Sequence, residues 1–70
     1  MSKRKISVIL PVFNEEENIP TIVETLSTLF DEQLTNFNFE IIFVDDGSKD
    51  KSWSLIEDLT GRLINIKGIR

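Results

Sequence analysis

The sequence predicts a Rossmann-like α/β unit with the element order β-α-β-α-β. Short runs rich in β-branched and aromatic residues, which are typical of strands buried in a parallel sheet, alternate with two stretches whose apolar residues recur at helical spacing. A polar loop directly follows each of the first two runs. Because right-handed crossovers join parallel strands, we expect a three-layer unit with the strands in the spatial order 3-2-1.

The first strand and the first helix are predicted within residues 5–30. Residues 5–10 form an apolar run that stops at Pro11, whose missing N–H suits the exit of a strand. Asn14 and Asn18 in the following loop are candidate helix caps, and Pro20 falls in the first turn of the helix, where a missing donor is harmless. The apolar stripe of this helix comprises Ile19, Ile22, Val23, Leu26, Leu29 and Phe30.

The second strand and the second helix follow a loop that is predicted over residues 31–38. Residues 39–44 form the strand, again apolar and rich in β-branched and aromatic side chains. Residues 51–61 form the helix, with Ser48 or Asp50 as the residue that caps its start.

The last strand is predicted over residues 62–69, after Gly61 in the left-handed position expected just past a helix end. Trp53 lies on an apolar helix face, so we assign it to the core and not to sugar stacking. The predicted core comprises Ile6, Val8, Ile9, Leu10, Ile22, Val23, Leu26, Ile41, Val44, Trp53, Ile56 and Leu59.

The first strand of such a sheet would keep an open edge, and the chain stops close to its last strand. We therefore interpret residues 1–70 as a single truncated domain, the N-terminal segment of a longer protein. Unpaired backbone groups along that edge predict that the fragment self-associates and that its stability is marginal.

Composition excludes several classes of function. The chain has no cysteine and no histidine, which removes disulfides, thiolate chemistry, histidine bases and nearly every zinc site. A net charge of −4 argues against nucleic acid as a partner. No stretch approaches the roughly 20 apolar residues of a membrane span. The absence of cysteine agrees with a reducing compartment, so a cytoplasmic location is expected.

Two polar loops, "PVFNEEEN" and "VDDGSKD", leave adjacent strands at their carboxyl ends. In open α/β sheets this rim binds ligands, and the N–H groups at the starts of two helices point to it. Asp-Asp-Gly-Ser on its own is more often a turn and a helix cap. The presence of both loops on one rim favours a ligand site.

The stretches "ISVILPVFNEEENI" and "FEIIFVDDGSKDKSWSLIEDL" resemble the nucleotide-binding start of family 2 glycosyltransferases, which have the GT-A fold. The glutamate-rich first loop is most similar to the dolichol-phosphate mannosyltransferase-like branch, the polyprenyl-phosphate hexosyltransferases. The resemblance implies that this segment forms the nucleobase side of a site for a UDP- or GDP-sugar. The full-length parent would transfer a hexose, with inversion, to an acceptor such as a polyprenyl phosphate. It would serve cell envelope polysaccharide synthesis at the cytoplasmic face of a membrane, with membrane contact only through downstream segments.

The resemblance also implies which residues meet the nucleotide. Pro11, Phe13 and Glu15 match the loop that frames the base, although Phe13 replaces a commoner tyrosine and so lacks its phenolic hydrogen bond. Asp46 matches the carboxylate that accepts the N–H of the base ring, and Val44 lines the same pocket. Uracil and guanine both present such an N–H, and an ionised carboxylate only accepts hydrogen bonds, so the chemistry agrees.

Strand alternation points Asp45 the other way from Asp46, so we expect Asp45 to hold loop N–H groups. No metal site is therefore assigned to the pair. The resemblance implies Mg²⁺ or Mn²⁺ in the full-length parent, held by a later Asp-x-Asp motif that is absent here. The catalytic base is absent as well, so we assign no catalytic residue and expect the fragment alone to be inactive.

Two other interpretations compete with this one. The first is a small flavodoxin-like or receiver-like module that binds magnesium or a protein partner through its acidic rim. Against it, the first strand ends in Pro11 and Val12 and not in an aspartate. The second is a fragment that folds but has no affinity for any ligand.

Overall fold

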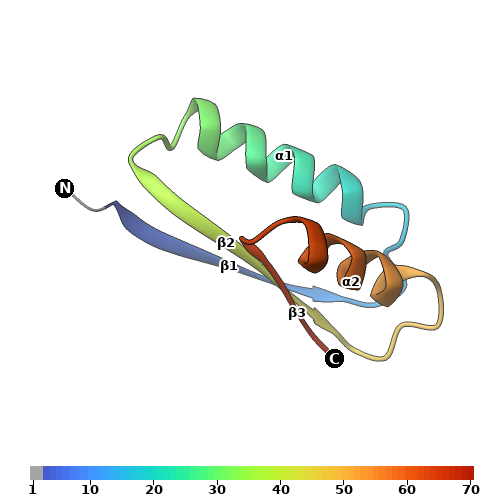
Figure 1. Ribbon diagram of the computed structural model, residues 1–70. Coiled ribbons are helices and arrows are strands. Elements are labelled where there is room, and N and C mark those ends of the chain that lie inside the picture. The colour runs from blue at the N-terminus through green and yellow to red at the C-terminus, as the bar shows by residue number, and fades with distance from the viewer. Residues whose placement is uncertain (1–2) are drawn as a thin grey trace.

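The computed structural model describes residues 3–70 and contains three parallel strands and two helices (Figure 1). The elements are β1 (Arg4–Val12), α1 (Ile19–Glu32), β2 (Phe37–Asp45), α2 (Ser52–Arg62) and β3 (Ile66–Ile69). The sheet order is β1-β2-β3, with both pairs parallel. This confirms the predicted α/β class, the element order and the strand order, which is 3-2-1 when read from the opposite edge.

The prediction of three layers is wrong for the residues described, which form two. Figure 1 shows α1 and α2 on the same side of the sheet. Both crossovers run in the same direction across the sheet, from β1 to β2 and from β2 to β3. Two crossovers of the same hand that step the same way place their helices on the same face. The sheet therefore has one covered face and one face that these residues leave open.

The core lies between the covered face and the helices. Its buried apolar residues are Val12, Ile19, Val23, Ile41, Phe43, Ile56 and Ile66, with Trp53 and Leu59 among those packed against it. Alternation along β2 sends Ile41, Phe43 and Asp45 to the covered face and leaves Val44 half-buried on the other. Ile9 was predicted in the core but is 63% exposed, because it projects from the open face.

Strand β1 is longer than predicted and includes Pro11 near its end. The backbone carbonyl of Val12 accepts a hydrogen bond from the N–H of Asp46, so Val12 directs its backbone groups toward β2. Its predecessor Pro11 therefore directs its nitrogen away from β2, to the outer edge of the sheet. An edge position without a ladder bond is where a strand tolerates proline.

Other boundaries also differ from the prediction. Helix α1 runs to Glu32 and β2 begins at Phe37, so the loop predicted over residues 31–38 is shorter. The prediction for Gly61 is wrong, since α2 continues to Arg62 and leaves the helix through Leu63 in an extended conformation. In the described part of the chain, no helix is both long and apolar enough to span a bilayer.

Candidate nucleotide site at the carboxyl rim

Two loops form the carboxyl rim of the sheet. The first rim loop, residues 13–18, connects β1 to α1, and the second rim loop, residues 46–51, connects β2 to α2. Strands β1 and β2 are adjacent and in register up to the pair Val12–Asp45. The two loops therefore leave the sheet side by side, and the N–H of Asp46 joins them through its 2.9 Å bond to the carbonyl of Val12.

The two adjacent aspartates have different surroundings. Asp45 ends β2 on the covered face, is only 4% exposed, and accepts the N–H of Ser48 through Oδ1 at 2.8 Å. Gly47, which lies between Asp46 and Ser48 in this tight turn, has a φ of +80°, which glycine adopts without steric cost. Asp46 is exposed. The predicted contact between Asp45 and a loop N–H is therefore confirmed, while the carboxylate of Asp46 faces solvent.

Four of the five residues predicted to meet the base lie on or just beyond the open face of the sheet. Pro11 and Val44 are direct partners in the β1–β2 register, so their side chains are neighbours on that face. Phe13 follows Pro11 by two residues, and Asp46 follows Val44 by two residues. Phe13 is 55% exposed although it is a large apolar side chain. Phe13 and Asp46 are the first residues after the last register pair, Val12–Asp45. An exposed aromatic ring and an exposed carboxylate at the same end of two paired strands suit a flat ligand with N–H groups at its edge.

Glu15, the fifth predicted residue, points toward α1. It is half-buried, and its Oε2 accepts the side-chain N–H of Asn18 at 2.7 Å. Asn18 occupies the cap position of α1, but its side chain makes this bond instead of capping the helix. Glu15 and Pro11 both line a cavity of about 350 Å³ between β1 and α1. Glu15 therefore shares a cavity with Pro11, while its carboxylate is bonded to Asn18.

The sequence prediction of the site missed a set of hydrogen bonds between the two rim loops. Three consecutive backbone N–H groups of the first rim loop donate to three side chains of the second rim loop and the start of α2. The pairs are Asn14 with Ser48 Oγ at 2.9 Å, Glu15 with Ser52 Oγ at 2.8 Å, and Glu16 with Asp50 Oδ2 at 3.1 Å. We call this set the rim network. Serine and aspartate at alternate positions 48, 50 and 52 were the signal, but the sequence does not show which loop they would hold.

Asp50 connects the rim network to α2. Its Oδ1 accepts the N–H of Ser52, the first residue of the helix, as its predicted capping role requires, although the cap position itself falls on Lys51. Burial opposes ionisation of Asp50. Hydrogen bonds from the hydroxyl and N–H of Ser52 and from the N–H of Glu16 outweigh that effect and hold the pKa of Asp50 below its usual value. The carboxylate is therefore a charged acceptor, which strengthens both backbone bonds.

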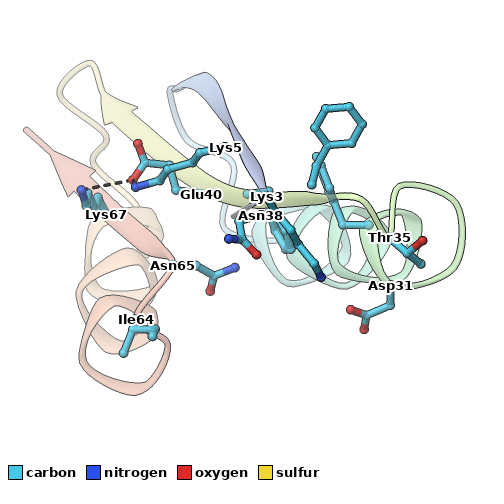
Figure 2. A pocket seen from close by; sticks show the side chains of 12 residues that line it. Lys3, Lys5, Asp31, Thr35, Asn38, Glu40, Ile64, Asn65 and Lys67 are labelled. Carbon is cyan, nitrogen blue, oxygen red and sulfur yellow. Dashed lines mark ion pairs between the residues drawn. The ribbon is translucent and has the colours of Figure 1, made fainter. Parts of the chain in front are cut away.

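A second polar region lies on the open face, toward the amino ends of the strands. Glu40 is buried there, and Figure 2 shows Lys5 and Lys67 near it. Both lysine Nζ atoms lie 3.1 Å from Glu40 Oε2, and the Ser7 hydroxyl donates to Oε1 at 2.7 Å. The Ser7 hydrogen bond, followed by those of the lysines, lowers the pKa of Glu40 to about 2. We call these four residues the Glu40 cluster.

The Glu40 cluster borders a second, larger cavity of about 740 Å³, which Lys3, Asn38 and Asn65 also line (Figure 2). Size alone would favour this cavity as the ligand site. It lies, however, at the amino half of the strands, whereas open α/β sheets bind ligands at the carboxyl ends. Two of its lysines are also engaged by Glu40. The carboxyl rim is therefore the better candidate for a ligand site.

Acidic side chains do not gather into a metal site in the described part of the chain. Among residues 3–70 no group of three or more carboxylates is placed to hold an ion. Residues 3–70 therefore do not fit the magnesium or manganese that the family resemblance implies for the full-length parent.

The fold is a parallel α/β unit with two joined loops at its carboxyl rim, and comparisons with known proteins identify its family. The family model "Glycosyl transferase family 2" matches residues 7–70. A prophage bactoprenol glucosyl transferase homolog of Escherichia coli K12 is 47% identical over 55 residues, which are 79% of this chain and 17% of that protein. A dolichol-phosphate mannosyltransferase of Pyrococcus furiosus is 40% identical over 58 residues, 83% of this chain and 15% of that protein.

Structural similarity points the same way. The crystal structure of residues 1–349 of TarS from S. aureus superimposes with a TM-score of 0.69 and 34% identity, covering 93% of this chain and 18% of that one. The chain belongs to glycosyl transferase family 2. It spans about a sixth of the length of the curated relatives it matches. The family match overturns the receiver-like interpretation.

Proposed function

We propose that the carboxyl rim binds the base of a nucleoside diphosphate sugar, in an enzyme whose full-length form transfers a hexose to a polyprenyl phosphate with inversion. Pro11, Phe13, Val44 and Asp46 contact the base in this proposal, and Glu15 supports the loop beside it. The observation that carries the proposal is the contrast between Asp45 and Asp46. The carboxylate of Asp45 is buried and accepts the N–H of Ser48 in its own loop. Asp46 is exposed, and its backbone N–H is held by the carbonyl of Val12.

The chemistry of Asp46 supports base binding. An ionised carboxylate only accepts hydrogen bonds, so it complements the ring N–H of uracil or guanine and opposes bases that present an acceptor there. Phe13 offers the exposed ring face on which a base can stack, and stacking of this kind is worth about 1–3 kcal/mol per base in nucleic acid complexes.

The acceptor is proposed from the relatives. Their names include a bactoprenol glucosyl transferase and an undecaprenyl-phosphate 4-deoxy-4-formamido-L-arabinose transferase, both of which act with polyprenyl carriers according to those names. Location at the cytoplasmic face of a membrane and a role in cell envelope polysaccharides follow from this proposal. Inversion is inferred from the family resemblance alone.

Calorimetric titration of the full-length enzyme with UDP and with GDP tests base binding. Asp46→Asn places an amide group where the base N–H needs an acceptor, so we expect a loss of about 1.5–3 kcal/mol, roughly ten- to a hundredfold in affinity. Asp45→Asn is the matched control one residue away. Its remaining oxygen still accepts the N–H of Ser48, so we expect nucleotide affinity close to that of the wild type.

Equal losses in two equally stable variants would contradict this division between the aspartates. Turnover can be checked in the same preparations with UDP- and GDP-hexoses and a short-chain polyprenyl phosphate. The configuration of the product, read by NMR coupling at the anomeric carbon, tests inversion separately.

A further inference from the structure

We infer that Ser48, Asp50 and Ser52 are positioning residues of the nucleotide site. They hold the first rim loop in the conformation that presents Phe13 to the ligand and keeps Glu15 beside it. This inference rests on the proposed function, because it explains how that site keeps its shape. It assigns a role to side chains that do not themselves contact the base.

The backbone of Asn14, which lies between Phe13 and Glu15, has an unusual conformation. Its φ is +52°, in the left-handed region that non-glycine residues rarely adopt and that asparagine tolerates better than most. Such a conformation persists when surrounding contacts fix it. Asn14 is held from two directions, since its N–H donates to Ser48 Oγ and its Oδ1 accepts the N–H of Lys49 at 2.8 Å.

The acceptors of the rim network are better anchored than the first rim loop, which they hold. Ser48 is 5% exposed and Ser52 is fully buried, while Phe13 and Asn14 are exposed. The carboxylate of Asp50 accepts the N–H of Glu16 with one oxygen and that of Ser52 with the other. The second rim loop and α2 thus act as a fixed frame, and the first rim loop takes its shape from them.

Each acceptor of the rim network binds a different amide of the first rim loop. The hydrogen bonds of the N–H groups of residues 14, 15 and 16 are partly buried, and an unpaired N–H is unfavourable where it is shielded from water. Each has its own acceptor. Removal of one acceptor therefore frees one amide of the first rim loop. The loop residues beside the base then move more freely, while the sheet and helices keep their structure.

Amide hydrogen exchange at single-residue resolution tests the network in the full-length protein. Ser48→Ala should accelerate exchange at Asn14, and Ser52→Ala at Glu15. Asp50→Ala should accelerate exchange at Glu16 and also at Ser52, since Asp50 accepts both N–H groups. The expected acceleration is about five- to tenfold at the named amide, the loss of one ordinary hydrogen bond. Ser54→Ala is the matched control, because Ser54 lies on α2 two residues beyond Ser52 and is exposed. Uniform acceleration of all three amides in each variant would overturn the one-to-one assignment.

Nucleotide binding tests the positioning role. In the full-length enzyme, Ser48→Ala and Ser52→Ala should raise the KM for the sugar nucleotide about five- to tenfold with little change in kcat, since the base pocket and not the reacting centre is altered. The ratio of UDP to GDP affinities should also move toward one. General destabilisation would not change that ratio. Ser48→Thr keeps the hydroxyl and should restore both quantities, and Ser54→Ala should change neither.

The outcomes separate this inference from the proposed function. Accelerated exchange with unchanged nucleotide affinity and an unchanged UDP-to-GDP ratio would overturn the positioning role and leave base binding at Asp46 intact. A wild-type enzyme that binds neither UDP nor GDP would overturn the proposed function, and the positioning role with it. Accelerated exchange together with a relaxed base preference, rescued by Ser48→Thr, supports the inference.

Discussion

The rim network and the Glu40 cluster are both polar groups set into a small α/β unit, but they hold different things. In the rim network, side chains of the second rim loop and of the start of α2 accept backbone N–H groups of the first rim loop. In the Glu40 cluster, side chains from all three strands meet one another: Ser7 and Lys5 from β1, Glu40 from β2 and Lys67 from β3. The first fixes the path of the chain, whereas the second fixes only the positions of side chains on strands that the sheet already orders.

This difference indicates why one region suits a ligand site. A ligand needs atoms at fixed positions before it binds, and backbone held by buried acceptors provides them at a low entropic cost of binding. Lys5 and Lys67 are 57% and 59% exposed and sit on flexible stems. In the Glu40 cluster, Lys5, Lys67 and Ser7 therefore stabilise the charge of Glu40 on the open face of the sheet. Three predictions test this contrast, from the largest expected effect to the smallest.

The largest effect is expected at Asp45, where the second rim loop is tied to the end of β2. Asp45→Ala leaves the N–H of Ser48 without its acceptor in a buried turn, which costs about 1–3 kcal/mol of unfolding free energy. Asp46→Ala, at the exposed neighbour, should stay within about 0.5 kcal/mol. Chemical denaturation of both variants measures the two values. Equal destabilisation would show that the rim does not depend on this buried bond.

Asp45 also shows how far the sequence could predict the molecule. The strands, helices and their order follow from apolar periodicity and turn residues, which are local signals. The division between Asp45 and Asp46 followed from strand alternation. The layer count did not, because it depends on the direction in which successive crossovers step across the sheet. Ile9 was misplaced for the same reason, since an apolar residue on an open face looks identical in sequence to one in the core.

The two networks were harder to predict, because each joins residues more than 30 positions apart. Glu40 lies inside an apolar strand run, and its partners Lys5 and Lys67 come from neighbouring strands whose register no local pattern fixes. The amides that Ser48, Asp50 and Ser52 bind belong to a loop, where the backbone path follows from tertiary contacts. Candidate ligand residues were accessible through the resemblance, but the residues that position them were not.

An intermediate effect is expected at Glu40, as a change in the pH dependence of stability. Its pKa is lowered from 4.5 to about 2 in the folded chain, first by Ser7 and then by the lysines. The stability that ionised Glu40 contributes to the folded chain is therefore fully present above about pH 4.5 and is lost as the pH falls through about 2. Glu40→Gln should be less stable than the wild type at neutral pH, and the difference should close on acidification.

Denaturant titrations between pH 7 and pH 2 measure that difference. Glu24→Gln is the matched control, since Glu24 is an exposed carboxylate on α1. Its difference from the wild type should change less over the same range. A gap between wild type and Glu40→Gln that stays constant down to pH 2 would show that the carboxylate is not held in its charged form by these partners.

The smallest effect is expected from salt, and it separates the two networks most directly. Raising the ionic strength from 0.1 to 1 M shortens the Debye length from about 10 to about 3 Å, which weakens pairs between exposed charges. The lysines around Glu40 are more than half exposed, whereas the rim serines are buried and bond neutral N–H groups.

The stability difference between wild type and Glu40→Gln should therefore shrink in 1 M NaCl, while that between wild type and Ser48→Ala should persist. Comparison within each pair cancels the general effect of salt on folding. If both differences shrink in parallel, the rim network is electrostatic in origin like the Glu40 cluster, and the contrast between a network that holds backbone and one that holds charge is lost.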